Sequence, residues 1–289
     1  MISIIICSVN KSLLEQLKLN IRETVGVPFE LIAIDNNIEK KSIAAVYNAK
    51  AGDAKFNCLC FLHEDVIIHS NDWGKVLIEL LSDEKIGLVG VSGAVYKSKY
   101  AATWSACDKS LYRTHSIQHF KNSSASIETS INPDNDSFSE VVVIDGVFMA
   151  TTKKVFSQFR FDEVLLTGFH GYDIDYSLLV SSKYKIVVSY EILLEHLSEG
   201  QLNKEWLDNS ITLHNKWKKR LPAQVKILKK SIIQFSDSLA CGLIVRVATK
   251  HKGYKLMVIK TYFKLLFIYF RFNRMKHTKL VAEYLLSFR

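Results

Sequence analysis

The segment CLCFLHED, residues 58–65, is the most informative part of this chain. Its first five residues, Cys58 to Leu62, form an apolar run of the length of a buried strand, and His63-Glu64-Asp65 follows without a gap. Carboxylates at the end of a buried strand are costly unless they bind something, because a buried charge without a partner loses its hydration. We therefore interpret His63-Glu64-Asp65 as part of a ligand site.

Strand-like and helix-like segments alternate on either side of this run. Strands are expected at Ile2–Cys7, Glu30–Asp35, Cys58–Leu62 and Ile86–Val91, and helices at Leu13–Ile21, Ser42–Ala49 and Trp73–Leu81. Near-continuous apolar strands alternating with amphipathic helices predict an α/β fold, a mostly parallel sheet with helices on both faces. Ligands of such sheets bind beyond the carboxyl ends of the strands, where Ser8, Asp35 and His63-Glu64-Asp65 fall.

The middle of the chain is less regular. Residues 97–140 have neither a helical nor a strand period, so we expect a long irregular insert. Val141–Ala150 returns to a strand pattern, broken at Asp145-Gly146. A glycine inside a strand indicates either close approach of a ligand to the backbone or a simple bulge.

The composition is that of a globular protein, with 48% hydrophobic and 23% charged residues among 289. The five cysteines are odd in number and mostly lie in apolar runs, which is typical of reduced thiols in a cytosolic protein. The apolar run Ile2–Cys7 is too short for a signal peptide, so a cytoplasmic location is expected.

The net charge of +9 is unevenly distributed. Residues 1–220 carry 24 Lys and Arg against 27 Asp and Glu, whereas residues 221–289 carry 14 against 2. We therefore divide the chain into a main domain, residues 1–219, and a basic amphipathic helical extension, residues 220–289. Such asymmetry suggests an anionic partner for the extension. The sequence has no recognisable nucleic-acid-binding module, so we expect no nucleic acid and favour a membrane surface.

The extension contains a candidate membrane-surface helix. From Gly253 onward, Lys260, Lys264 and Arg271 would line one face of a helix, with aromatic and aliphatic residues on the rest. Lysines interrupt the apolar run well short of the roughly 20 residues that a spanning helix needs. A helix in the membrane interface fits this pattern and predicts peripheral association with the inner face of the membrane. The alternative is packing against the main domain or a second subunit.

A metal site is predicted from two histidines and a carboxylate. In an extended segment His63 and Asp65 face one way and Glu64 the other. Imidazole together with carboxylate suits Mn²⁺, whereas Mg²⁺ prefers oxygen ligands. His196, in Leu194-Glu195-His196, is the third candidate ligand. The alternatives are an exposed acidic turn at residues 63–65 and a core histidine at 196.

The segment from Gly168 to Asp175 is expected to open a helix. Asp173 and Asp175 are two residues apart and cannot share a helical face, so at most one is a catalytic base, and we choose Asp173. Alternatively, both carboxylates only stabilise the helix N-terminus.

A second group of polar residues is expected to hold a nucleotide. Asp35 and Asn36 would hydrogen-bond a uracil or guanine base and its ribose, framed by Ser8 and Asn10 on the other side; an Asx turn at Asp35 is the alternative.

With these residues in view, residues 1–218 resemble the GT-A-fold glycosyltransferases of the family-two type. The similarity is to the bacterial glycosyltransferase-like group related to inverting galactosyl- and N-acetylgalactosaminyltransferases. Residues 32–37 are similar to its base-binding strand end, residues 63–65 occupy the place of its Asp-x-Asp motif, and His196 that of its distal metal histidine. Residues 168–173 are similar to Gly-Trp-Gly-Gly-Glu-Asp, whose last Asp is the catalytic base. The chain departs from these motifs at His63, His170 and Tyr172.

The resemblance implies an inverting, metal-assisted transfer of a sugar from a nucleotide-diphosphate sugar, with a UDP-sugar favoured. The acceptor would be a glycan or a lipid-linked glycan, in bacterial surface polysaccharide or glycoconjugate synthesis. Glu64 would contact the nucleotide. The sugar and acceptor side is expected to comprise Trp104, Asp145, Gly146, His170, Gly171 and Tyr172. Rival interpretations are a non-catalytic nucleotide-sugar or glycan-binding module and a nucleotidyltransferase; residues 8–12 lack the glycine- and arginine-rich loop that the latter would need.

Overall fold

We describe the protein from a computed structural model that covers residues 1–120, 125–268, 282 and 286. At its centre lies a sheet with the strand order β10-β13-β5-β12-β3-β1-β2. Its strands are β1 (Ile2–Ser8), β2 (Phe29–Asp35), β3 (Cys58–Leu62), β5 (Ile86–Gly90), β10 (Phe138–Val141), β12 (Phe148–Thr152) and β13 (Lys185–Ser189). β2, β1, β3, β5 and β13 run in one direction and β12 and β10 in the other, which confirms the expected mostly parallel sheet.

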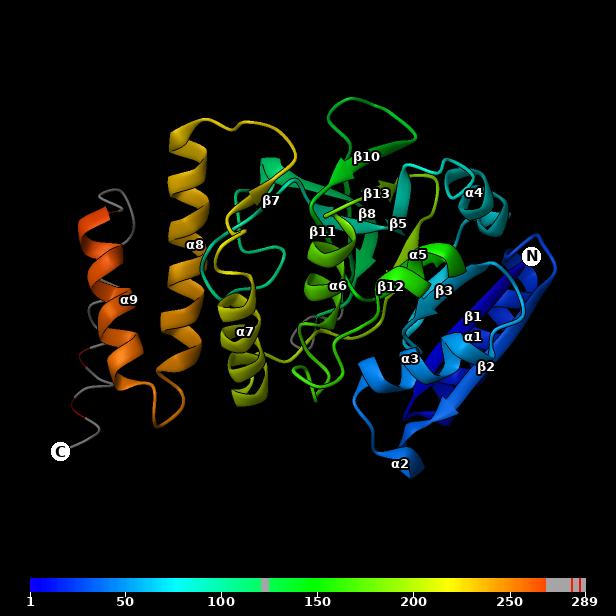
Figure 1. The fold of residues 1–289 in the computed structure, drawn as a ribbon, viewed down its shortest axis with the longest axis horizontal. Helices are drawn as coiled ribbons and strands as arrows, with labels where there is room; N and C mark the ends of the chain where they lie inside the picture. Colours follow the sequence, from blue (N-terminus) through cyan, green and yellow to red (C-terminus); the bar gives the residue numbers. More distant parts are fainter. Residues whose placement is uncertain (121–124, 269–281, 283–285, 287–289) are drawn as a thin grey trace.

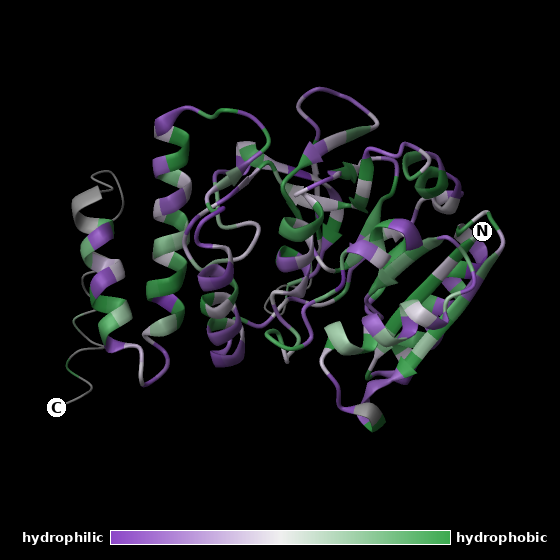
Figure 2. Ribbon diagram, in the orientation of Figure 1, coloured by the Kyte–Doolittle hydropathy of each residue, from purple (hydrophilic) through white to green (hydrophobic). Residues whose placement is uncertain are grey.

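Helices cover both faces of this sheet (Figure 1). One face carries α1 (Lys11–Thr24) and α4 (Trp73–Leu80), and the other carries α3 (Ile43–Asp53), α5 (Lys153–Gln158) and α6 (Tyr172–Val180). Ile4 and Ile6 of β1 belong to the core on the first face and Ile5 to the core on the second. Because both faces are buried, the central strands are largely hydrophobic, as Figure 2 shows.

A second sheet, with the order β11-β6-β8-β14-β4, lies against the first and carries part of the site. Its strands are β4 (Val66–Ile68), β6 (Ser92–Ala94), β8 (Tyr112–Gln118), β11 (Val143–Ile144) and β14 (Leu194–His196), and β9 (Ile127–Ile131) pairs with β8. The prediction of an irregular insert over residues 97–140 was therefore wrong. The strands in that range are partly exposed on both faces, so their side chains do not alternate cleanly between apolar and polar.

Three helices stack on the side of the molecule away from β1 and β2 (Figure 1). They are α7 (Lys204–Trp217), α8 (Lys230–Ala248) and α9 (Lys255–Ile268), and their buried contacts include Trp206, Val245 and Val258. α8 is long and apolar enough to cross a membrane, yet 56% of it is buried within the protein. Arg271, expected on the face of the membrane-surface helix, lies outside the described residues.

The chain beyond the proposed boundary at residue 220 contacts the main domain directly, because β15 (Ala223–Gln224) pairs with β7 (Tyr96–Lys97).

All five cysteines are free thiols, and Cys58, Cys60, Cys107 and Cys241 are buried.

Candidate functional site

A large cleft opens at the carboxyl ends of β1 and β3. Its volume is about 1790 Å³, and it runs from the loop after β1, past His63 and Asp65, to α7 and α8. A pocket for one small ligand usually occupies ~300–1,000 Å³, so this cleft has room for two ligands side by side.

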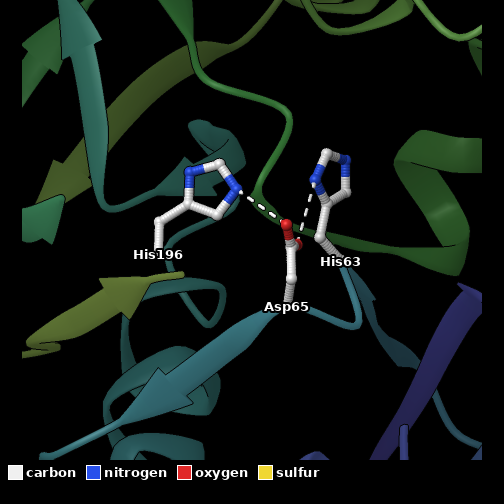
Figure 3. A group of neighbouring side chains, drawn as sticks. All are labelled: His63, Asp65 and His196. Carbon is white, nitrogen blue, oxygen red and sulfur yellow. Dashed lines mark ion pairs between the residues drawn. The ribbon is translucent and has the colours of Figure 1, made fainter. Parts of the chain in front are cut away.

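His63, Asp65 and His196 meet on one wall of the cleft (Figure 3). His63 directly follows β3 and Asp65 directly precedes β4. The antiparallel pairing of β14 with β4 sets His196 opposite Val66, next to Asp65. The Nε2 atom of His196 lies 3.4 Å from one oxygen of Asp65, and the Nδ1 atom of His63 lies 3.9 Å from the other. One nitrogen or oxygen from each residue lies within 4.8 Å of the others, so the three side chains surround a space that suits a metal ion.

Hydrogen bonds fix which ring nitrogen each histidine offers to this space. The hydroxyl of Tyr172 donates to the carbonyl of Gly146, so His63 donates its Nε2–H to the tyrosine oxygen at 2.7 Å. Its Nδ1 is thereby left unprotonated on the side of Asp65. The pattern of one imidazole nitrogen bound to a neighbour and the other free is that of metal-ligating histidines.

Gln118 fixes which ring nitrogen His196 offers to this space. Its amide group donates to the carbonyls of His119 and Ser198, both at 2.7 Å, which turns its oxygen toward the Nδ1 atom of His196 at 3.2 Å. His196 donates from Nδ1 and presents Nε2 to Asp65. Two oriented imidazoles and one carboxylate are a donor set that fits Mn²⁺.

The charges of this group favour a cation. Burial lowers the pKa of His63 to about 4, so this ring is neutral at pH 7. Burial also acts to raise the pKa of Asp65, but its hydrogen bond with His196 and the two nearby imidazoles hold it well below its usual range. Burial acts to lower the pKa of His196, but its hydrogen bond with Asp65 and the carboxylate charge raise it, so a metal bound at Nε2 would have to displace a proton there.

Asp173 lies at the first turn of α6 and faces the same cleft. Its carboxylate accepts a hydrogen bond from the backbone amide of Gly146 at 3.2 Å. Burial, and then the charge of Asp145, raise the pKa of Asp173 to about 7. A carboxylate with a pKa near neutrality is well matched to accept a proton from a sugar hydroxyl.

Asp175, the other carboxylate of this helix, points away from the cleft. It is fully buried, accepts from Trp217 Nε1 at 2.6 Å and forms an ion pair with Lys216 at 2.8 Å. The two carboxylates therefore serve different faces of α6: Asp173 meets the cleft, and Asp175 fastens α6 to α7.

Comparison with known proteins identifies the family. The model of a glycosyltransferase-like family matches residues 3–222. The chain belongs to the glycosyltransferase-like family.

Solved structures of two glycosyltransferases share the GT-A fold of this glycosyltransferase-like chain. One is the crystal structure of GalNAc-T7 with UDP, GalNAc and Mn²⁺, at a TM-score of 0.51 and 12% identity, over 89% of this chain and 57% of the other. The second is the mannosyltransferase PcManGT from Pyrobaculum calidifontis in complex with GDP-Man and Mn²⁺, at a TM-score of 0.50 and 11% identity, over 97% and 85% of the two chains. No curated protein sequence matches the chain. The fold expected from the sequence is confirmed.

Several residues predicted to bind the nucleotide in this glycosyltransferase-like chain form hydrogen bonds within the loop that follows β1. Glu64 accepts from the Ser8 hydroxyl and, at 3.0–3.1 Å, from the backbone amides of Val9 and Asn10. The Asn10 side chain caps α1. Glu64 lines the cleft and, with the Asn10 cap, fixes the conformation of this loop; contact of either residue with a nucleotide stays a prediction.

Asp35 and Asn36 form the turn that begins α2 (Asn36–Glu39). The carboxylate of Asp35 accepts from the backbone amide of Asn37 at 3.1 Å, which is the Asx turn considered as the alternative. Asn36 exchanges two hydrogen bonds with the backbone of Lys41. Asn36 lines the cleft, whereas Asp35 keeps 30% of its side chain exposed and lies 3.7 Å from Lys11 Nζ; nucleotide contact by these two residues stays a prediction.

The predicted sugar-side residues fall into two groups. Trp104, Asp145, His170 and Gly171 line the cleft, and Trp104 donates to Asp145 at 2.6 Å. Tyr172 also lines the cleft, but it is 4% exposed and its hydroxyl is engaged by His63 and Gly146, so it supports a metal-ligand candidate; a sugar contact by Tyr172 stays a prediction.

The close approach expected at Gly146 is made by the protein itself. A side chain at Gly146 would collide with the Tyr172 hydroxyl, and no ligand is needed to explain a glycine there.

Two features of the cleft were not predicted. Gln118 was assigned to an irregular insert, and only the pairing of β8 with β14 brings it to His196. The α8 residues that line the cleft were regarded as part of a separate extension. In both cases the position depends on tertiary pairing, for which the local sequence carries no signal.

Proposed function

We propose that this protein transfers a sugar from a nucleotide-diphosphate sugar to a hydroxyl group of a glycan acceptor, with inversion at the anomeric carbon. The observation that carries the proposal is the group His63, Asp65 and His196 on the same cleft as Asp173. The family match supports the reaction class. The two similar glycosyltransferases were solved with UDP or GDP-Man and with Mn²⁺, which supports a nucleotide-sugar donor and a divalent metal.

In this proposal His63, Asp65 and His196 hold the divalent metal, with Mn²⁺ preferred over Mg²⁺. When bound, the ion supplies positive charge that neutralises the diphosphate leaving group. The loop fixed by Glu64, together with Asp35 and Asn36, borders the nucleoside. We favour a uridine nucleotide for this position.

Asp173 acts as the general base. It takes the proton of the acceptor hydroxyl while the hydroxyl oxygen attacks the anomeric carbon, and the bond from that carbon to the diphosphate oxygen breaks on the opposite face. Asp145 keeps Asp173 basic enough for this step, since its negative charge disfavours a second ionised carboxylate nearby.

The proposal is tested by donor hydrolysis and transfer assays across UDP-, GDP- and dTDP-sugars with and without Mn²⁺. We expect turnover that needs Mn²⁺ and is lost in Asp65→Ala, together with loss of the thermal stabilisation that Mn²⁺ and UDP give the wild type. His196→Ala should weaken this stabilisation substantially. Metal-dependent UDP binding without any turnover would instead favour a non-catalytic nucleotide-sugar-binding module.

A further inference from the structure

The cleft continues beyond Asp173 to the first long helix of the C-terminal extension. Its far wall is formed by five residues of α8: Phe235, Leu239, Gly242, Leu243 and Arg246. They stand at positions i, i+4, i+7, i+8 and i+11, so they share one face of the helix. The donor site lies at the other end of the cleft, beside β1, and the α8 end is therefore left for the acceptor.

This wall is fixed to the main domain. Asp237, on the buried side of α8, accepts from the Tyr96 hydroxyl at 2.7 Å and from Ser98 Oγ at 2.6 Å. The neighbouring Ser236 accepts from the backbone amide of Asp108 at 3.1 Å. Because these bonds reach the segments around the cleft, α8 is a built part of it and not a loosely attached tail.

The chemistry of the wall is amphipathic. Phe235 is 47% exposed although it lines a cleft, and Leu239 and Leu243 continue its apolar surface. The guanidinium of Arg246 is exposed and has no ion pair or hydrogen bond to any residue in the described part of the chain. An apolar stripe that ends in an unpaired guanidinium suits a ligand with an apolar portion and a phosphate group.

We propose that α8 forms the acceptor subsite and that the acceptor is a sugar carried on a lipid phosphate, which supplies the hydroxyl that the proposed reaction needs. Its apolar chain lies along Phe235, Leu239 and Leu243, and its phosphate pairs with Arg246. This inference rests on the proposed function, because it assigns the α8 end of the cleft to the acceptor.

The test uses the full-length protein with dodecyl phosphate below its micellar concentration, titrated calorimetrically with and without UDP and Mn²⁺. Dodecyl maltoside and inorganic phosphate are the comparison probes. Wild type should bind dodecyl phosphate most tightly. Arg246→Gln should weaken that binding by about 10-fold or more and leave dodecyl maltoside unaffected, because only the phosphate forms charge-assisted hydrogen bonds with the guanidinium. Leu239→Gln should weaken both amphiphiles.

The matched control is Lys230→Gln, which removes an exposed cation of α8 outside the cleft and should leave all three probes unchanged. Equal binding of dodecyl phosphate by wild type and Arg246→Gln would overturn the inference, as would equal affinity of wild type for inorganic phosphate. Loss of Mn²⁺-dependent UDP binding in Arg246→Gln would place this residue at the donor site. Failure of wild type to bind UDP and Mn²⁺ would count against the proposed function alone, because the dodecyl phosphate titration without UDP stands by itself.

Discussion

At the scale of single residues, the orientation of the metal-ligand candidates depends on neighbours that are not themselves candidate ligands. Gln118 turns its amide oxygen toward His196 because its nitrogen is committed to the carbonyls of His119 and Ser198. Tyr172 holds the ring of His63 in the same way. Such partners typically change metal affinity by about 10–100-fold when they are lost.

Gln118→Leu should therefore weaken Mn²⁺ binding by about 10-fold or more, since His196 loses the acceptor that fixes its ring. Isothermal titration with Mn²⁺ measures the effect. Gln118→Glu keeps an acceptor beside Nδ1 and should recover part of the affinity. Gln158→Leu, on α5 and away from the cleft, is the control and should bind Mn²⁺ like wild type. Unchanged Mn²⁺ affinity in Gln118→Leu would contradict the role given to Gln118.

Asp173→Asn should lower turnover by roughly 10²–10⁴-fold while leaving UDP and Mn²⁺ binding intact, because the amide keeps the shape of the side chain and loses its basicity. The pH dependence is a separate signature. A raised pKa means that Asp173 carries a proton below about pH 7 and cannot act as a base there, so activity should fall on the acid side.

Asp145→Asn removes the charge that contributes to this shift, so the acid limb of the rate profile should move to lower pH. An acid limb that stays in place in Asp145→Asn, or an active Asp173→Asn, would show that the base has been misassigned.

At the scale of elements, α6 and α7 are joined by a buried ion pair that needs the second carboxylate of the helix. Asp175 accepts from Lys216 and from Trp217, and Lys216 also pairs with Asp162 at 2.8 Å. The junction holds Asp173 at the cleft by fixing the helix that carries it.

Asp175→Asn should lower the free energy of unfolding by about 1.5–3 kcal/mol, a range typical of hydrogen bonds to charged groups. The loss stays moderate because Lys216 keeps Asp162 as a partner. Denaturant unfolding measures it. Asp162→Asn removes a partly exposed partner of the same lysine and should cost less than about 1 kcal/mol. If Asp162→Asn were the more damaging substitution, the buried pair would not be what joins α6 to α7.

The sequence predicted those elements whose neighbours cover both faces. Cys58–Leu62 was predicted to the residue, because a strand buried on both sides must be apolar throughout. β8 and β9 were not predicted, because both strands are partly exposed and their side chains do not alternate cleanly between apolar and polar. His63, Asp65 and His196 were recognised as a possible group from residue type and position, whereas Gln118 and Arg246 depend on long-range pairing that no local pattern records.

At the scale of the whole molecule, the extension has two faces with different surroundings. Val258, Thr261 and Leu265 of α9 are buried, so one side of this helix packs against the rest of the protein, which was the alternative to membrane binding. The other side exposes Leu256 and Phe263, which are 64% and 51% accessible, together with Lys252 and Lys260 nearby. This mixture of cations and apolar groups keeps the membrane-surface hypothesis in force.

The double substitution Lys252→Gln and Lys260→Gln should weaken binding to anionic lipid vesicles by roughly 30-fold, because each basic residue near such a surface contributes ~1 kcal/mol. Vesicle sedimentation at low and high salt measures it, and binding should fall with salt. Lys85→Gln with Lys183→Gln removes two other exposed cations and should have little effect. A wild-type protein that ignores anionic vesicles at low salt would leave packing as the role of the extension.

The buried cysteines can be used to measure how often the surrounding chain opens. Burial raises the pKa of Cys58, Cys107 and Cys241 to about 12, so almost none of these sulfurs is a reactive thiolate at neutral pH. Alkylating reagents can therefore modify them only when the surrounding chain opens. Cys241 lies in α8 and Cys58 in the central sheet, so their separate labelling rates would distinguish detachment of α8 from unfolding of the whole protein.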